Sequence, residues 1–229
     1  MNIKALVAEF VGTFALIFVG VGAIAVTTAD KRGPDLVVIA LAHGLTIAVM
    51  VSATAAISGG HLNPAVTLGA LVAGRIRALG AVGYWVAQLL GGVAGALVIG
   101  TTVPAGQLRA AQFGVPFPGP GITPVEALVL ELVLTFFLMF VVFGTALDAR
   151  GAPRLAGLLI GLTITLDILV GGPITGAAMN PARFLGPALV NLSQLQYTWI
   201  YLVGPGLGAA LAALLWRFVL EEPAPATAR

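Results

Sequence analysis

Residues 58–65 read Ser-Gly-Gly-His-Leu-Asn-Pro-Ala, and residues 175–182 read Thr-Gly-Ala-Ala-Met-Asn-Pro-Ala. Each stretch leads into a short apolar segment, 63–74 in the first case and 180–190 in the second. Asn favours the N-cap of a helix, and Pro favours the first helical position, where its missing N–H costs nothing. We therefore expect a short helix to begin at each Asn-Pro pair.

The composition around these stretches is that of a membrane protein. Of the 229 residues, 59% are hydrophobic and only 9% are charged, whereas a soluble domain carries about 25% charged residues. Eleven Lys and Arg against nine Asp and Glu are too few for the basic stripe of a nucleic-acid partner. The chain contains no Cys, which excludes zinc–thiolate sites, and it carries no enzyme motif. We predict no enzymatic activity, no cofactor and no metal site.

Six apolar stretches are long enough to cross a membrane, which takes roughly 20 helical residues. They cover about 5–28, 36–57, 80–102, 125–147, 155–172 and 197–220, with the fifth expected to end at Gly171-Gly172-Pro173. At 1.5 Å per residue the two short helices would cover only ~16–18 Å, about half a bilayer. The sequence thus predicts an all-α integral membrane protein, a single domain over 1–229 with six spans and two re-entrant half-helices.

The chain repeats itself, with halves at about 1–115 and 122–229. Residues 8–14, Ala-Glu-Phe-Val-Gly-Thr-Phe, are similar to residues 130–136, Leu-Glu-Leu-Val-Leu-Thr-Phe. Each half holds three full spans, an odd number, so the second half must be inverted relative to the first. Inverted repeats place their functional site at the midplane between the halves.

The inversion brings the two short helices together, N-terminus to N-terminus, in mid-membrane. Non-helical backbone at that depth is tolerated only where it is buried in protein or lines a water-filled cavity. The runs 58–62 and 175–179 are such backbone. The geometry directs two partly positive helix ends and two Asn amides at one point.

Orientation follows from Lys and Arg, which favour the cytoplasmic side. Six spans place both termini on one side, and that side carries seven of these residues against three on the other. The seven are Lys4, Arg75, Arg77, Arg150, Arg154, Arg217 and Arg229, and the three are Lys31, Arg32 and Arg109. We expect both termini in the cytoplasm and the chain in the plasma (inner) membrane.

With these features the chain resembles the aquaporin (major intrinsic protein) family, from Glu9 through the sixth span. The resemblance implies a passive water channel that excludes protons and ions. It also implies a homotetramer in the lipid bilayer, with water and small neutral solutes as the permeating partners.

The resemblance assigns pore roles to both boxes, which comprise Asn63, Pro64, Ala65, Asn180, Pro181 and Ala182. The two Asn amides would donate hydrogen bonds to the permeating molecule. Backbone carbonyls would line the pore as acceptors, namely those of Gly59, Gly60, His61, Leu62, Gly176, Ala177, Ala178 and Met179.

The family also has a four-residue constriction near the outer mouth, which the resemblance places at His43, Ile168, Ala177 and Arg183. Water-selective members typically carry Phe and His at the first two positions. This combination is similar instead to that of the plant tonoplast-type members, which indicates a wider or differently polar constriction. Glycerol-facilitating members usually have Asp after the Arg, where this chain has Phe184.

Several residues keep a second interpretation. His43 could be a satisfied core histidine, and Arg183 could form a structural ion pair, with Asp167 as a candidate partner. His61 is better explained as a hydrogen-bonding support of its loop. Asp167 could face the outer vestibule or a neighbouring chain.

Glu9 and Glu131 occupy equivalent positions inside two spans. The resemblance implies that they bind the backbone of the re-entrant loops, and a proton relay is the alternative. His43 and Ile168 favour, as the second function within transport, a broader facilitator of neutral solutes such as ammonia, hydrogen peroxide, urea or glycerol. A secondary active transporter and a structural junction protein are the alternatives from other classes.

Overall fold

The computed structural model describes residues 2–29, 34–148 and 150–222. Within these ranges, six helical stretches are long and apolar enough to cross a membrane. They are α1 (Ile3–Thr28), α2 (Leu36–Ser58), α4 (Ala78–Thr102), α6 (Pro124–Val142), α7 (Ala156–Thr175) and α9 (Thr198–Leu215). The π-helical turn η2 (Phe143–Leu147) extends α6, and the π-helical turn η4 (Trp216–Leu220) extends α9. Lys31, Arg32 and Arg229, on which part of the predicted orientation rests, lie outside the described residues.

The predicted half-helices are present as α3 (Pro64–Val72) and α8 (Pro181–Asn191). Shorter elements complete the chain on the side where α1 ends: α5 (Ala105–Ala110), η1 (Gln112–Gly114) and η3 (Leu195–Tyr197). The all-α architecture of six spans and two half-helices is therefore confirmed.

The predicted end of the fifth span is wrong. We expected it at Gly171-Gly172-Pro173, but α7 continues through Pro173 to Thr175. A proline removes one helical hydrogen bond without obliging the chain to leave the helix. The helix stops instead at Gly176, whose left-handed φ of 80° suits a residue without a side chain.

Pairs of glycines show that the second half is inverted. Gly91 and Gly95 of α4 approach the carbonyls of Phe10 and Phe14 of α1, so these two helices run parallel. In α7, by contrast, Gly157 approaches the carbonyl of Ala48, and Gly161 approaches that of Gly44, which comes earlier in α2. Helices α2 and α7 are therefore antiparallel, as an inverted repeat requires at the contact between its halves.

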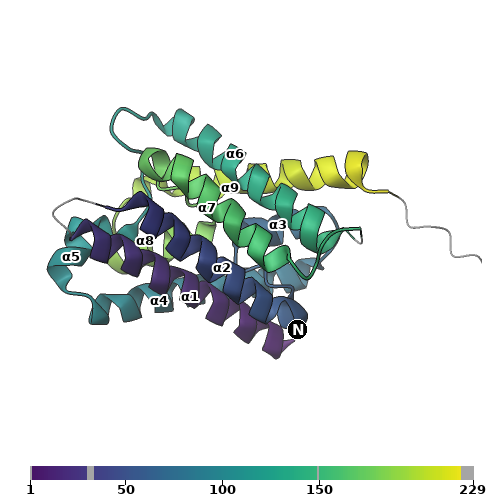
Figure 1. The fold of residues 1–229 in the computed structure, drawn as a ribbon, viewed down its shortest axis with the longest axis horizontal. Coiled ribbons are helices and arrows are strands. Elements are labelled where there is room, and N and C mark those ends of the chain that lie inside the picture. The colour runs from purple at the N-terminus through teal and green to yellow at the C-terminus, as the bar shows by residue number, and fades with distance from the viewer. Residues whose placement is uncertain (1, 30–33, 149, 223–229) are drawn as a thin grey trace, which may run out of the picture.

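The two halves interlock through the half-helices. Helix α3 of the first half packs against α9 of the second, and α8 of the second packs against α4 of the first. Figure 1 shows α1, α2 and α4 on one side of the molecule and α6, α7 and α9 on the other. Each half-helix thus packs against a span of the other half, and its N-terminus lies at the centre of the molecule.

A hydrogen-bonded cluster follows the π-helical turn of α6. The Asp148 carboxylate accepts hydrogen bonds from the Arg150 guanidinium (2.7 and 3.0 Å) and from the Trp216 indole (3.0 Å). These donors hold the pKa of Asp148 well below its usual range. The cluster anchors the chain beside Leu147, which lines the central cavity.

The close approach of α2 and α7 predicts that Gly161→Leu destabilises the fold. A Cβ at position 161 would lie 2.6 Å from the Cβ of Ala48 and would press on the Gly44 carbonyl, which is backbone and cannot yield. Overpacking of this kind costs typically about 1–3 kcal/mol. We expect a lower melting temperature of the purified protein in detergent.

Gly100→Leu is the matched control, because a Cβ at Gly100 meets no atom within 4 Å. An equal loss of stability in both variants would contradict this packing argument.

Candidate functional site

A buried glutamate of α1 holds the first glycine-rich loop. The Glu9 carboxylate accepts hydrogen bonds from the backbone N–H groups of His61 (3.0 Å) and Leu62 (2.6 Å). It also accepts from the Ser58 hydroxyl (2.7 Å) and the Gln88 amide (2.8 Å). Because Glu9 is completely buried, these donors replace the water that a carboxylate would otherwise bind.

Glu131 of α6 holds the second loop in the same way. Its carboxylate accepts from the backbone N–H groups of Ala178 (2.9 Å) and Met179 (2.8 Å), and from the Thr175 hydroxyl (2.8 Å). Glu131 is also completely buried. The structure therefore places both glutamates against the loops, and neither lines the central cavity.

Two tyrosines that sequence analysis missed complete these supports. The Tyr84 hydroxyl donates to the Ser58 carbonyl (2.7 Å), and the Tyr201 hydroxyl donates to the Thr175 carbonyl (2.6 Å). Each tyrosine follows its partner by 26 residues. That equal spacing in the two halves is the signal that could have identified them.

Both loops share an uncommon backbone conformation. Gly59 and Gly176 are left-handed, with φ of 88° and 80°, and so are Leu62 and Met179, each with φ of 51°. A left-handed residue with a side chain is disfavoured by about 1–2 kcal/mol. The hydrogen bonds from the N–H groups of Leu62 and Met179 to the glutamates offset this strain.

The two Asn side chains cross-brace the loops. The Asn63 Oδ1 atom accepts from Ala65 N–H (2.8 Å), which caps α3, and its Nδ2 donates to the Met179 carbonyl (2.9 Å). The Asn180 Oδ1 atom caps α8, and its Nδ2 donates to the Leu62 carbonyl (3.0 Å). An amide NH₂ carries two hydrogens, so each Asn keeps one N–H, and both residues line the cavity.

Carbonyls on both loops are left open. Within the described residues, no hydrogen bond from another protein group reaches the carbonyl oxygens of Gly59, Gly60, His61, Gly176, Ala177 and Ala178. Five of these residues line a central cavity, and Gly176 lines a larger vestibule that adjoins it. Buried carbonyls need partners, so these six are the acceptors that the site offers to a molecule inside it.

Two predicted acceptors already have partners within the protein. The Leu62 carbonyl accepts from Asn180 and from the Thr13 hydroxyl (3.3 Å), and Leu62 does not line the cavity. The Met179 carbonyl accepts from Asn63, but Met179 lines the cavity and a carbonyl oxygen can accept a second hydrogen bond. Each residue directly precedes a box, and the cross-bracing amide of the opposite box occupies its carbonyl.

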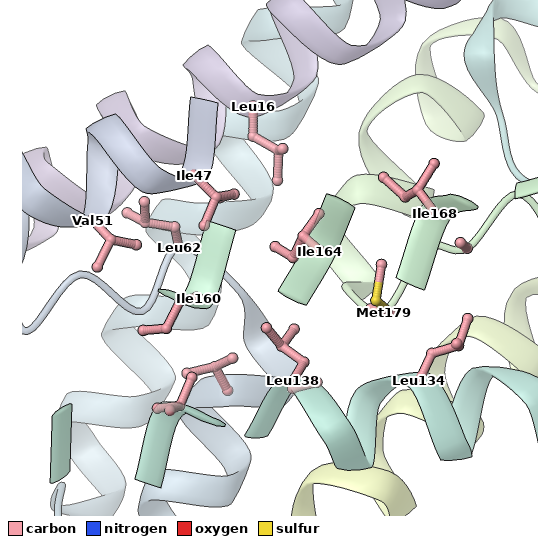
Figure 2. Packing of buried hydrophobic residues seen from close by; sticks show 14 of the residues in the cluster. Leu16, Ile47, Val51, Leu62, Leu134, Leu138, Ile160, Ile164, Ile168 and Met179 are labelled. Atoms are coloured by element: carbon pink, nitrogen blue, oxygen red, sulfur yellow. The ribbon is translucent and has the colours of Figure 1, made fainter. Parts of the chain in front are cut away.

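The central cavity is narrow and mostly apolar opposite the loops. Its volume is about 40 Å³, room for a few waters. Figure 2 shows side chains of α1, α2, α6 and α7 converging there, among them Leu16, Ile47, Leu138 and Ile164. A larger vestibule of about 470 Å³ adjoins it on the side where α1 ends.

His43, Ile168 and Arg183 line both the cavity and the vestibule, so they lie where the two meet. Ala177 lines the cavity side only. The His43 Nδ1 atom donates to the Ile39 carbonyl (2.8 Å), since a carbonyl can only accept. Its Nε2 atom, which has no partner among the described residues, is a buried acceptor that packs against Gly20 of α1.

Arg183 supplies the complementary donor. Its Nη1 atom donates to the Gly114 carbonyl (2.7 Å), and its Nε atom has no partner among the described residues. The alternative ion pair with Asp167 is not formed in the described part of the chain. Asp167 is buried and lines neither the cavity nor the vestibule.

The repeat gives His43 and Arg183 no polar counterparts. The boxes are offset by 117 positions, from Asn63 to Asn180, so the four constriction positions have counterparts in the other half. These counterparts are Ile160, Val51, Gly60 and Val66, and all of them line the cavity. The backbone is thus repeated, whereas Ile160 and Val66 take the places of His43 and Arg183 in the other half.

His61 supports its own loop. Its Nδ1 atom lies 3.1 Å from the Thr67 hydroxyl, and its ring packs edge-on against Tyr84 at 5.2 Å. Gln88, which bonds both Glu9 and Thr67, was not identified from the sequence. Its counterpart in the other half is Pro205, so no repeated residue pointed to it.

The chain matches one family model over residues 1–216, that of the major intrinsic protein. It is 43% identical over 231 residues to a probable aquaporin TIP3-2 of Arabidopsis thaliana, covering 96% of this chain and 84% of that protein. It is 44% identical to a probable aquaporin TIP-type alpha of Phaseolus vulgaris, covering 98% and 89%.

A solved structure has the same fold. The aquaglyceroporin from Plasmodium falciparum superposes with a TM-score of 0.86 at 26% identity, covering 96% of this chain and 97% of that one.

The carboxylate contacts predict that Glu131→Gln loosens the second loop. The amide NH₂ would face backbone N–H groups or the Thr175 hydroxyl, so a buried donor would lose its acceptor. This costs about 1–3 kcal/mol. We expect a lower free energy of unfolding in detergent and a lower permeability of reconstituted vesicles, with the same direction for Glu9→Gln.

Glu222→Gln serves as the control, because its side chain is 76% exposed and pairs only at the surface with Arg150. If the two buried substitutions were as mild as this one, the glutamates would not be holding the loops.

Proposed function

We propose that this chain, which belongs to the major intrinsic protein, or aquaporin, family, conducts water in single file and excludes protons and ions. As a member of that family it is a multi-pass membrane channel for water or small solutes and not an enzyme. The observation that carries this proposal is the cavity wall. Five residues with open carbonyls and the two Asn residues line it together with apolar side chains of the spans.

Single-file passage follows from this wall and from the width of the cavity. Each carbonyl offers an acceptor to one hydrogen of a passing water. The apolar side chains opposite offer none, so a water is never held from all sides. Pore diameter and the lining donors and acceptors together set selectivity in such channels.

Proton exclusion is assigned to the centre. The remaining N–H of Asn63 and of Asn180 would both donate to the oxygen of the water between them. That water must then donate its own hydrogens outward in both directions, which interrupts a proton wire. The N-termini of α3 and α8 add partial positive charge, which raises the energy of any cation there.

The constriction is assigned to His43, Ile168, Ala177 and Arg183. Arg183 contributes a fixed positive charge and a donor, and His43 contributes an acceptor. Ile168 contributes an apolar edge. A solute that passes must therefore be small, neutral and able to hydrogen bond on one side.

A broader neutral-solute facilitator is the second candidate. The observation in its favour is the pair His43 and Ile168, which leaves the constriction less filled by aromatic rings than Phe and His would. Ammonia, hydrogen peroxide, urea and glycerol are the solutes to test.

Coupled transport has less support. A proton relay needs carboxylates that reach the passage. The carboxylates of Glu9 and Glu131 are instead occupied by loop donors outside the cavity.

We extend the proposal to assembly and orientation. The chain forms a homotetramer with one pore per subunit, and both termini lie in the cytoplasm. The vestibule that Arg183 lines would then open on the outer side. A plasma (inner) membrane stays our prediction for the location, although the TIP designation of the relatives favours the tonoplast type instead.

The constriction predicts opposite effects of two substitutions. Arg183→Val removes the charge and the donor, so larger neutral solutes and ions should pass more readily. His43→Phe narrows the opening, so uptake of urea and glycerol should fall relative to water. Stopped-flow osmotic experiments on proteoliposomes measure each rate.

Arg109→Val is the control, because Arg109 lines neither the cavity nor the vestibule. Solute profiles identical to wild type in both constriction variants would remove these residues from the filter. A solute that accumulated against its gradient when a proton gradient was imposed would overturn the channel itself.

The absence of Cys from the chain, together with Ala177 at the constriction, predicts insensitivity to mercurials. No thiolate is available to bind the metal. Water permeability of proteoliposomes should be unchanged by HgCl₂, and Ala177→Cys should make it sensitive. Inhibition of the unaltered protein at concentrations that block the cysteine variant would refute the prediction.

A further inference from the structure

A groove runs along the outside of the molecule between α1 and α4. Its volume is about 430 Å³, and its lining is apolar, with Leu6 and Phe10 on one side and Leu79 and Val86 on the other. Leu79 is 71% exposed and Val86 is 53% exposed. These residues belong to two membrane spans, so the groove opens toward hydrocarbon and not toward water.

Two basic residues stand beside this groove on the side where both helices begin. Helices α1 and α4 are parallel, with Phe10 beside Gly91 and Phe14 beside Gly95. Arg77 precedes Leu79 by two residues, whereas Lys4 is level with Trp85, so the two cations are about 12 Å apart along the helices. Both are exposed. Among the residues that the structure describes, neither takes part in a salt bridge, whereas the nearby Arg75 pairs with Glu221.

We propose that this groove binds an anionic phospholipid, with one acyl chain between α1 and α4 and the anionic headgroup between Lys4 and Arg77. The apolar lining suits an acyl chain and offers nothing to a polar ligand. The two cations, on neighbouring helices, suit an anionic headgroup where the spans leave the hydrocarbon. Basic residues at this level attract anionic lipids.

The inverted half provides an internal comparison. The offset from Glu9 to Glu131 relates Lys4 to Glu126, which is exposed and acidic. The offset between the boxes relates Arg77 to Gln194 and Val82, in the groove wall, to Trp199. The equivalent end on the other side of the membrane therefore has opposite charge and a bulkier wall. Because only one copy has this combination, the channel architecture itself does not require it.

The test compares two lipids with the same acyl chains. Purified full-length protein in detergent is titrated with phosphatidylglycerol or with phosphatidylcholine. Native mass spectrometry counts the lipids retained, and the melting temperature is recorded in parallel. We expect phosphatidylglycerol to be retained with a preference of roughly tenfold or more, since two cations contribute.

Two variants separate the headgroup from the chain. The double substitution Lys4→Gln with Arg77→Gln should abolish the preference and leave phosphatidylcholine retention unchanged. Val82→Trp imports the residue of the other half and should reduce the retention of both lipids. Water permeability should be unchanged in both variants, because none of these residues lines the pore. Arg109→Gln, a charge loss elsewhere on the surface, should leave the preference intact.

Three results would overturn the proposal. One is a preference that survives the double substitution, or that Arg109→Gln abolishes equally well. Another is a rise in melting temperature with inorganic phosphate alone that matches the rise with the lipid, because the groove would then contribute nothing. A third is dissociation of the oligomer by Val82→Trp without loss of lipid, which would assign the groove to a second copy of the chain. None of these results bears on which solute the pore conducts.

Discussion

Carbonyls can stay open in mid-membrane only if the rest of the same backbone is fully bonded. Residues 59–61 and 176–178 present acceptors to the cavity, and hydrocarbon offers nothing to their N–H groups. The carboxylates of Glu9 and Glu131 meet this constraint, because an ionised carboxylate accepts several hydrogen bonds at once and donates none. The loops, the half-helices that follow them and the path between them all depend on these two side chains.

The same bonds account for the strained residues before each box. Leu62 and Met179 are left-handed. The N–H of each donates to a glutamate, and the carbonyl of each accepts from the Asn amide of the opposite box. A residue in this conformation turns the chain sharply enough to begin a helix within one step. The left-handed residue therefore lets each cavity-lining loop turn directly into its half-helix, α3 or α8.

Hydropathy and the repeat predicted most of the fold, because spans, half-helices and inversion depend on length, composition and parity, which are local or countable. The end of the fifth span at Thr175 was missed, because Gly171-Gly172-Pro173 predicts a helix end, whereas α7 continues through Pro173. The bonds of Tyr84, Tyr201 and Gln88 join residues far apart in sequence, so no local pattern contained them. The partners of the Leu62 and Met179 carbonyls were missed for the same reason, since these partners come from the other half.

The two halves agree where the backbone is shaped and differ where a solute would be touched. Glutamate, tyrosine and asparagine recur at the supporting positions. The repeat counterparts of Arg183 and His43, by contrast, are Val66 and Ile160. A side chain that supports a loop cannot change without moving the wall. A side chain that only projects from the wall can change freely. The two halves therefore share one backbone scaffold, and His43 and Arg183 are present in one of the two copies only. Asn63 and Asn180, which brace the loops and also line the cavity, are the same in both halves.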